Sequence, residues 1–495
     1  MIIGIDLGTT NSCAAYVKDG SAQVIKNAEG QYTTPSVVTF KNNGMSYIGQ
    51  DAKNRKTLDP KDTVWSYKRF MGRPYSLVKK EFESMPYLFT CDQEDNICVY
   101  VGGRRMTVSE IASRVLSKVR TDSQKTLKTT IDSAVITVPA YFTDSQREAT
   151  REAGKLAGLD VKRIISEPTA AALAFCAQNP FEGTMAVYDL GGGTFDISIL
   201  DVKDGAFKVL STAGDTILGG DDIDKRVSDW IIKEVSRTLN VDLKAEYEDP
   251  VTRNVTTFAM QKIRTQAEKA KIEMTNNAYV DIELPNLCHG LDFKARLTKA
   301  NLDNMMSFVV NKTLKLCQQA LDDAKLKNVD KVILVGGSTK SPYVREQVSM
   351  FFKSFVDTSL DPDQAVALGA AIMAKALEEN NAKLVDVIPL NLGILCVKKD
   401  SRAHETAVII PANTTIPAEK TMCFTTSKDN QEAIDLCMMQ GPSVMGTMRI
   451  DLAPMRKGTP RVKVTFSVDA DGILSVTATD DKGSVKQTTL KKRAV

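Results

Sequence analysis

The sequence predicts an α/β domain over residues 1–380 and an all-β domain over residues 388–495. Up to about residue 380, strand-like apolar runs alternate with long amphipathic stretches. Beyond a polar stretch, short alternating strands are separated by turn signals. The length agrees with this division, because 495 residues exceed what one hydrophobic core normally supports. We expect residues 381–387 to link the two domains.

Apolar periodicity predicts the elements of the α/β domain. Short β-branched runs predict buried strands at 134–138, 185–188 and 331–335. Helical periodicity between such runs predicts helices over 109–127, 145–156, 222–238, 256–274 and 299–324. Ser145 is followed three residues later by Glu148, which is a capping-box pattern, so we expect the second of these helices to start at Ser145.

The second domain begins where helical periodicity stops, after the polar residues 378–383. Residues 461–468 place their apolar side chains on one face, and Asp471-Gly472 is typical of a hairpin turn into 473–478. Turn signals recur at 399–400, 428–430, 440–442, 457–458, 471–472 and 481–483. This regular spacing predicts a β-sandwich.

One motif occurs twice in the α/β domain, as IGIDLGTT (residues 3–10) and VYDLGGGT (residues 187–194). In each copy an apolar strand leads into Asp-Leu-Gly and then into small residues. Their backbone can turn sharply and bring N–H groups up to a polyphosphate. A single copy is equally consistent with an acidic β-turn. Two copies, each behind a matching strand, predict one nucleotide bound between two lobes.

Carboxylates accompany both motifs. Asp6, Asp189 and Asp196 could hold the water ligands of a magnesium ion or orient an attacking water. A third glycine-rich segment at 333–340 also ends a strand and could lie beside a purine and ribose, although a plain strand-to-helix turn explains it equally well. The sequence contains no P-loop pattern.

Composition narrows the function classes. Lys+Arg 64 against Asp+Glu 61 gives a net charge of +3, which is no electrostatic footprint for nucleic acid at this size. Nine scattered cysteines and two histidines argue against a zinc site or a disulfide framework, so we expect buried thiols in a reducing compartment. No apolar run is long enough for a membrane span, and Met1 leads directly into a strand. We therefore expect a protein of the cytoplasm or of the matrix of a mitochondrion or related organelle, neither secreted nor bound to a membrane.

The chain resembles the heat-shock protein 70 (DnaK) family of chaperones along essentially its whole length. Besides the two phosphate motifs, the segments VPAYF (138–142), EPTAAA (167–172) and VGGST (335–339) occur in the family's order and spacing. The resemblance implies an actin-like (ribonuclease H-like) two-lobed ATPase domain, followed by a peptide-binding β-sandwich. Asn11 and segment 161–165 are more similar to bacterial and mitochondrial members.

The resemblance implies that the first domain binds ATP or ADP with Mg²⁺, and K⁺ is a further candidate cation. Lys68 would stand over the γ-phosphate, with Thr194 and Asp196 near the attacking water. Asp6, Glu167 and Asp189 would meet magnesium through water. From spacing alone, Lys68 and Glu167 would be interpreted as surface charges. The phosphates would be bound by Gly8, Thr9, Thr10, Asn11, Gly191, Gly192 and Gly193, and the adenosine by Gly219, Glu268, Lys271, Thr275, Gly336, Gly337, Ser338, Lys340 and Asp363.

The resemblance also implies a peptide cleft in the sandwich and a route that couples it to the nucleotide. Pro139 and Arg147 match coupling residues of the ATPase domain, and Leu384, Val385 and Asp386 match the coupling segment of the linker. The cleft corresponds to Leu392, Ile394, Val397, Phe424, Ser427, Ile434 and Leu436. Considered without the family, these cleft residues would be interpreted as sandwich core.

The resemblance therefore implies an ATP-dependent chaperone whose slow hydrolysis switches the sandwich between weak and tight binding of exposed hydrophobic segments of unfolded proteins. A J-domain co-chaperone and a nucleotide exchange factor would be its partners, and we expect a monomer. One alternative is a weakly coupled relative that serves as a chaperone regulator or exchange factor. A small-molecule kinase and an actin-like filament protein are further alternatives, but neither explains residues 388–495.

The sequence departs from the family in four places. The linker keeps only Leu384 and Val385 as apolar residues, so we expect weaker coupling between the domains. Lys340 stands where many members have an arginine stacked on adenine, which predicts lower nucleotide affinity. Ser427 and Pro442 replace family residues around the peptide site and leave peptide preference open. The sequence ends at Val495, where the family continues into a helical lid, so it belongs either to a lidless protein or to a truncated form. Without a lid, bound peptide is expected to exchange quickly.

Overall fold

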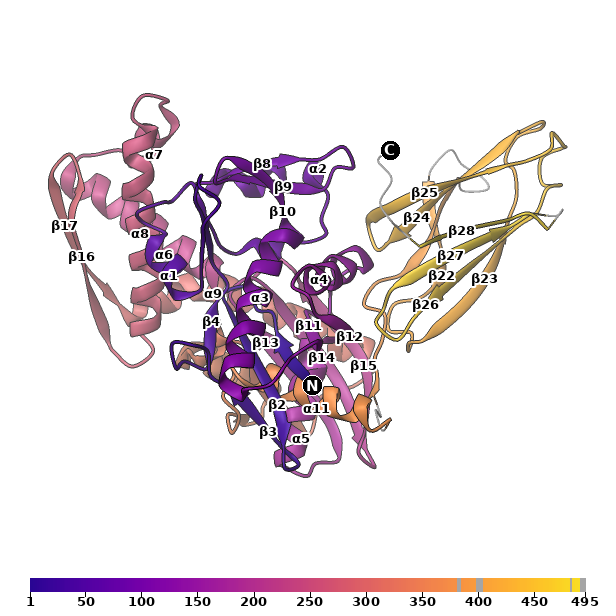
Figure 1. The fold of residues 1–495 in the computed structure, drawn as a ribbon, viewed down its shortest axis with the longest axis horizontal. Coiled ribbons are helices and arrows are strands. Elements are labelled where there is room, and N and C mark those ends of the chain that lie inside the picture. The colour runs from indigo at the N-terminus through magenta and orange to yellow at the C-terminus, as the bar shows by residue number, and fades with distance from the viewer. Residues whose placement is uncertain (381–383, 398–403, 481–482, 490–495) are drawn as a thin grey trace.

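The computed structural model describes residues 1–380, 384–397, 404–480 and 483–489. Two α/β lobes are followed by a β-sandwich, which Figure 1 shows in orange to yellow beside α4 and β12 of the first lobe. The predicted turns at 399–400 and at 481–482 lie outside the described residues. Among the described helices, none combines the length and apolar composition that a membrane span requires.

The central sheets of the two lobes are built on the same plan. In lobe I the strand order is β12-β11-β1-β2-β3, with β4 paired to β2, and in lobe II it is β19-β18-β13-β14-β15-β20. Each phosphate motif forms the turn of an antiparallel hairpin, β1–β2 or β13–β14, whose first strand also pairs in parallel with β11 or β18. The strands are β1 Ile2–Asp6, β2 Asn11–Lys18, β3 Ser21–Ile25, β4 Thr33–Pro35, β11 Ser133–Val138, β12 Asp160–Ser166, β13 Gly183–Leu190, β14 Phe195–Lys203, β15 Ala206–Asp215, β18 Lys331–Val335, β19 Val356–Asp357 and β20 Leu384–Val385. The three strands predicted from apolar runs and both motif hairpins are thereby confirmed.

Two helices, α5 (Glu167–Gln178) and α11 (Ala365–Glu378), join the lobes. α11 packs on β1 and β2, α5 packs on β13, and the two helices contact each other. A side chain at Gly369 would place its Cβ 1.6 Å from the carbonyl oxygen of Ala170, so only glycine allows this approach. Buried side chains of both sheets, including Val135 and Val187, belong to the cluster around these helices. The base of the cleft is therefore one continuous core.

The rest of lobe I covers the first sheet and forms one wall of the cleft. The helix predicted at 145–156 begins at Asp144, and the side-chain oxygen of Gln146 accepts a hydrogen bond from the Thr143 N–H at 3.1 Å. The predicted start at Ser145 is therefore wrong, because Thr143, two residues earlier, supplies the N-cap. The elements of lobe I outside its central sheet are β5 Val38–Phe40, β6 Ser46–Ile48, α1 Gln50–Arg55, β7 Thr63–Val64, η1 Tyr67–Phe70, α2 Tyr75–Val78, η2 Lys79–Ser84, β8 Leu88–Cys91, β9 Ile97–Val101, β10 Arg104–Thr107, α3 Val108–Leu127 and α4 Asp144–Leu156.

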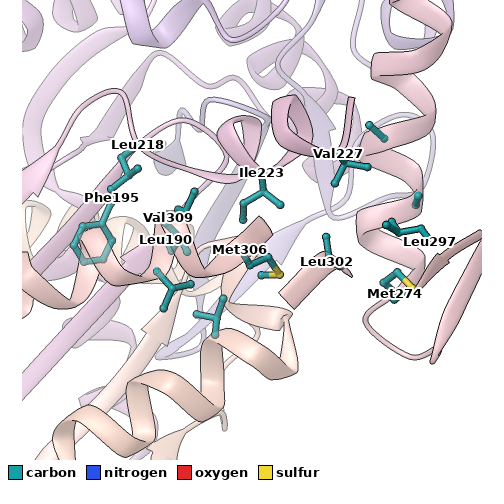
Figure 2. Packing of buried hydrophobic residues seen from close by; sticks show 14 of the residues in the cluster. Leu190, Phe195, Leu218, Ile223, Val227, Met274, Leu297, Leu302, Met306 and Val309 are labelled. Carbon is teal, nitrogen blue, oxygen red and sulfur yellow. The ribbon is translucent and has the colours of Figure 1, made fainter. Parts of the chain in front are cut away.

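The remaining elements of lobe II form the opposite wall. Figure 2 shows Leu190 and Phe195, on either side of the second phosphate turn, packed in the same cluster as Ile223 and Met306. This packing fixes the base of the second phosphate hairpin. The elements are α6 Gly220–Leu239, α7 Leu243–Glu248, α8 Arg253–Glu273, β16 Tyr279–Cys288, β17 Leu291–Thr298, α9 Lys299–Asp323, η3 Gly337–Lys340 and α10 Pro342–Phe352. The predicted helices at 222–238, 256–274 and 299–324 correspond to α6, α8 and α9.

The C-terminal part is a sandwich of two sheets, in the orders β22-β21-β24-β25 and β23-β26-β27-β28. In β26, Val462, Val464 and Phe466 are buried whereas Lys463 is exposed, which confirms the predicted alternation. The predicted hairpin is also confirmed, since β26 pairs with β27 up to Val468 and Leu474 on either side of Asp471-Gly472. The strands are β21 Leu392–Val397, β22 His404–Ile410, β23 Ala418–Phe424, β24 Ala433–Gln440, β25 Ser443–Asp451, β26 Val462–Val468, β27 Leu474–Thr479 and β28 Val485–Thr489.

The β26–β27 turn docks the sandwich onto lobe I. The Asp471 carboxylate accepts hydrogen bonds from Arg151 at 2.5 Å and from the Ile164 N–H at 3.1 Å. It also forms an ion pair with Arg163 at 3.1 Å. Arg147 donates to the Asp471 carbonyl oxygen at 3.2 Å. One acidic residue therefore makes contact with both α4 and β12.

The linker is held by lobe II and by the sandwich. Leu384 and Val385 form β20, which pairs in parallel with Phe207 and Lys208 of β15. Further along, the Ile416 N–H donates to the Asp386 carbonyl at 2.9 Å, and the Ile388 N–H donates to the Thr414 carbonyl at 2.9 Å. The linker is thus docked by its backbone despite its few apolar residues. The expected weaker coupling between the two domains depends on the free energy of docking, so it stays a prediction.

We predict that Asp471→Ala releases the sandwich from lobe I. The substitution removes the acceptor of two arginines and one backbone N–H, and hydrogen bonds to charged groups contribute roughly 1.5–3 kcal/mol each. Small-angle X-ray scattering should show a larger radius of gyration, and proteolysis near Leu384 should be faster. Asp435→Ala, at an exposed position of β24, is the matched control. An unchanged radius for Asp471→Ala would contradict this role.

Candidate functional site

A cleft of about 570 Å³ separates the two lobes, and both phosphate turns open into it. The predicted nucleotide residues converge on this cleft although they are spread from Asp6 to Asp363. Those that line it are Asp6, Gly8, Thr9, Thr10, Asn11, Lys68, Glu167, Asp189, Gly191, Gly192, Thr194, Glu268, Lys271, Thr275, Gly336, Gly337, Ser338, Lys340 and Asp363. The structure thus brings together residues that the sequence could relate only through family resemblance.

The two phosphate turns approach each other so closely that side chains are excluded. A Cβ at Gly192 would lie 1.8 Å from Thr10 Oγ1, and one at Gly193 would lie 2.5 Å from Thr9 Cγ2. Gly219 packs beneath the second turn, where a Cβ would lie 2.6 Å from the Gly192 carbonyl oxygen. Gly193 and Gly219 therefore shape the cleft without lining it.

A buried ion pair lies at the centre of the site. Lys68, on η1, donates to Glu167 at 2.5 Å, and the two side chains are 1% and 8% exposed. Glu167 is the first residue of α5, where the positive end of the helix dipole favours a carboxylate. Removing either partner would leave a buried charge without compensation, which is strongly destabilising. Lys68 and Glu167 are therefore core residues of the cleft and not surface charges.

Several carboxylates surround the single positive charge of Lys68. Burial, and next the Glu167 charge, raise the pKa of Asp6 to about 7 even though Lys68 lowers it. Burial likewise raises the pKa of Asp189 well above its ordinary value, and Glu167 and Asp196 add to this shift. Such clustered oxygen donors with excess negative charge suit a hard divalent cation. Among the described residues, no three carboxylate, thiol or imidazole side chains converge closely enough to hold a metal ion directly.

Asp196 has one carboxylate oxygen available. The Tyr141 N–H donates to Oδ1 at 3.0 Å, whereas Oδ2 is buried and has no hydrogen-bond partner within the described chain. Burial, followed by the Glu167 charge, raises the pKa of Asp196 to about 7. Asp196 is therefore a buried acceptor with a pKa suited to taking a proton near neutral pH.

Charged side chains organise the opposite end of the cleft. Glu268 on α8 pairs across the cleft with Lys53 at 2.7 Å and with Lys56 at 3.8 Å. Burial alone would raise the pKa of Glu268, but Lys56 and Lys53 lower it to about 2. Lys340 is held by Asp363 at 2.5 Å and by Asp361 at 3.3 Å. The ammonium group of Lys340, the last residue of η3, is thus held by two carboxylates.

Sequence reasoning missed the residues that join the two walls. They share one property: their partner lies in the other lobe, so no local pattern identifies them. Asp221 and Asp222, for example, resemble the acidic residues found in the first turn of many helices. The missed residues that line the cleft include Lys53, Lys56, Trp65, Ser66, Arg69, Asp221, Asp222 and Arg264.

The predicted peptide-binding residues lie in or beside the sandwich core. Leu392, Ile394, Ile434 and Leu436 are buried in that core, and the half-buried Phe424 packs against it. Ser427 is exposed, and the side chain of Val397 lies outside the described part. The peptide-binding roles stay a prediction. Of the nine thiols, Cys13, Cys98, Cys288 and Cys317 are buried, four others are half-buried and Cys423 is exposed, so the expectation of buried thiols is confirmed only in part.

The predicted coupling residues lie between the site and the sandwich. Arg147 donates to the carbonyl oxygens of Ala140 at 3.3 Å and Phe142 at 3.4 Å, in the segment that begins with the buried Pro139. Asp144 accepts a hydrogen bond from the Leu474 N–H of the sandwich at 2.6 Å. Its own N–H donates to Gln440 at 3.2 Å. The first turn of α4 thus meets both sheets of the sandwich.

Comparison with known proteins agrees with this arrangement. Residues 2–494 match the family model described as Hsp70 protein. The chain is 42% identical to the chaperone protein dnaK of Cyanidioschyzon merolae over 495 residues, which cover 96% of this chain and 79% of that protein. It is 41% identical to the chaperone protein dnaK of Guillardia theta, with coverages of 98% and 78%. Identity to the corresponding protein of Cyanophora paradoxa is 42%, with coverages of 98% and 79%.

We predict that docking of the sandwich strengthens as pH falls from 7 towards 5. Burial in the interface raises the pKa of Asp144 from its ordinary value of 3.8 to about 7, despite the Leu474 hydrogen bond. Docking therefore favours the protonated acid, and it weakens as pH rises through the window between these values, by at most about 1.4 kcal/mol per pH unit. Scattering at several pH values should show this trend. Asp144→Asn should flatten it, and an equal pH dependence in that variant would contradict the assignment.

Proposed function

The chain belongs to the Hsp70 family of ATP-hydrolysing chaperones, and from this premise we propose how its residues perform the cycle. The observation that carries the proposal is the cleft in which Lys68, the carboxylates of Asp6, Glu167 and Asp189, and two glycine turns meet, with the buried Asp196 behind the cleft lining. We propose residues 1–380 as the ATPase domain, 381–387 as the linker and 388–495 as the peptide-binding domain. The β-sandwich that docks through its β26–β27 turn supports this division.

In the proposed reaction, ATP binds with its phosphates between the Gly8–Asn11 and Gly191–Thr194 turns. Lys68 neutralises charge that develops on the γ-phosphoryl group, and the free Oδ2 of Asp196 accepts a proton from the attacking water. Asp6, Glu167 and Asp189 would hold the water ligands of Mg²⁺, which offsets the negative charge of the phosphates. The fit rests on the surplus of carboxylates around one lysine. The pKa values of Asp6 and Asp189 are raised, and a bound metal cation would lower them by stabilising the ionised carboxylates.

On the other side of the cleft, we propose that Glu268, Lys271 and Thr275 of lobe II contact the ribose. Gly336 to Lys340 would lie along the base. Because Lys340 is already bound by two aspartates, its contribution to base binding would come mainly from its aliphatic stem. This arrangement supports the expectation that adenine is held less tightly than by a stacked arginine.

The structure combines a docked linker with a docked sandwich, so we propose that ATP favours this closed arrangement and that hydrolysis releases it. The sandwich would bind exposed hydrophobic segments of unfolded polypeptides. A J-domain protein would stimulate hydrolysis and an exchange factor would release ADP. The chain would act as a monomer in the cytoplasm or in an organelle matrix.

We predict that Lys68→Ala and Asp196→Asn lower the single-turnover rate of ATP hydrolysis roughly 10²–10³-fold, because each removes a group that acts on the reacting phosphate or water. The rate of the unaltered chain should rise when a hydrophobic peptide and a J-domain are added. Lys203→Ala, at an exposed position of β14, serves as the control. A hydrolysis rate that does not change when peptide and J-domain are added would instead favour a regulatory relative in which the two domains are not coupled.

A further inference from the structure

Two consecutive cations on η1 face different lobes. Lys68 donates to Glu167, which belongs to α5, as described above. The next residue, Arg69, extends across the cleft to lobe II. Its Nε donates to the Gly193 carbonyl oxygen at 3.1 Å, and its Nη2 donates to Asp222 at 2.6 Å. The side chain is 12% exposed, so these bonds are largely shielded from water.

The carbonyl groups of the second phosphate turn are held by two different lobes. The Gly220 N–H donates to the Gly191 carbonyl at 3.0 Å, and the Asp221 N–H donates to the Gly192 carbonyl at 2.7 Å. Both of these donors belong to the start of α6 in lobe II. The third carbonyl, of Gly193, accepts instead from Arg69 of lobe I. Separation of the lobes would therefore release the peptide group that precedes Thr194 and leave the other two in place.

Asp222 fixes the direction of the guanidinium group. Its Oδ2 also accepts the Gly219 N–H at 2.8 Å, so this carboxylate is anchored to the backbone beneath the turn. A planar guanidinium can donate hydrogen bonds to Gly193 and Asp222 at the same time, whereas an ammonium is a single point charge on a flexible stem. The pairing therefore requires arginine and not only a positive charge.

We infer that Arg69 is a positioning residue that sets the Gly193–Thr194 peptide in the phosphate site when the lobes close, so that ATP is hydrolysed only in the closed cleft. The inference rests on the role proposed above for the Gly191–Thr194 turn. It differs from a simple latch between the lobes, such as the bond from Lys61 to Asn254 at 2.6 Å. A latch changes the affinity for nucleotide, but not the rate at which bound ATP is hydrolysed.

The test compares Arg69→Met, Arg69→Lys and the latch control Lys61→Met in the full chain. Single-turnover hydrolysis at saturating ATP should fall about 10²-fold in Arg69→Met, the loss expected from a misplacement of about 1 Å. Arg69→Lys should recover less than half of that loss on a logarithmic scale, and Lys61→Met should hydrolyse ATP at the rate of the unaltered chain. Thermal unfolding of each variant checks that it is folded.

A second measurement does not depend on turnover. Arg69→Met should bind ADP within about threefold of the unaltered chain but bind ADP with aluminium fluoride, which imitates the transferring phosphoryl group, at least tenfold more weakly. Equal weakening of both ligands, or full recovery by Arg69→Lys, would overturn the inference. Lys68→Ala measured in parallel separates the two proposals: if it retains analogue binding while Arg69→Met loses it, the role of Lys68 fails and that of Arg69 stands.

Discussion

Close backbone contact between the two lobes is the constraint on which the rest of the structure depends. At the base of the cleft, Gly369 admits the carbonyl of Ala170, and at the phosphate turns Gly192 admits the side chain of Thr10. Both contacts require the absence of a Cβ. Because the lobes meet at these points, two hairpins that lie far apart in the sequence open into one cleft.

Contact between the lobes also brings charged side chains together in a region shielded from water. Glu167, Asp189 and Asp196 are buried around Lys68, and Asp6 is half-buried beside them. Burial and the neighbouring Glu167 charge raise the pKa values of Asp6 and Asp196, so keeping these groups ionised costs free energy. This surplus of negative charge supports the proposal that the ligand brings a compensating metal together with its phosphates. Arg69 adds a second cation, but its partners lie in lobe II, so it supports geometry more than it neutralises charge.

A contiguous set of contacts joins this site to the sandwich. Asp196 accepts from the N–H of Tyr141, and the neighbouring carbonyls of Ala140 and Phe142 accept from Arg147. Arg147 in turn contacts the carbonyl of Asp471 in the β26–β27 turn. The segment 139–142 is thus hydrogen-bonded both to Asp196, beside the cleft, and to Arg147, which contacts the docking turn. A change of its backbone would alter both, which is the physical requirement for coupling.

The sequence by itself determined whatever depends on local pattern. Strand–Asp-Leu-Gly–turn predicted two phosphate hairpins, alternation predicted β26, and turn signals placed the sandwich. Resemblance supplied Lys68 and Glu167, which spacing alone would have left on the surface. Only the tertiary structure decided the pairs that span the lobes, such as Arg69 with Gly193 and Lys53 with Glu268. It also decided the docking of Asp471 on α4 and β12. Such contacts join residues separated by tens to hundreds of positions, and their energies depend on burial that no local window contains.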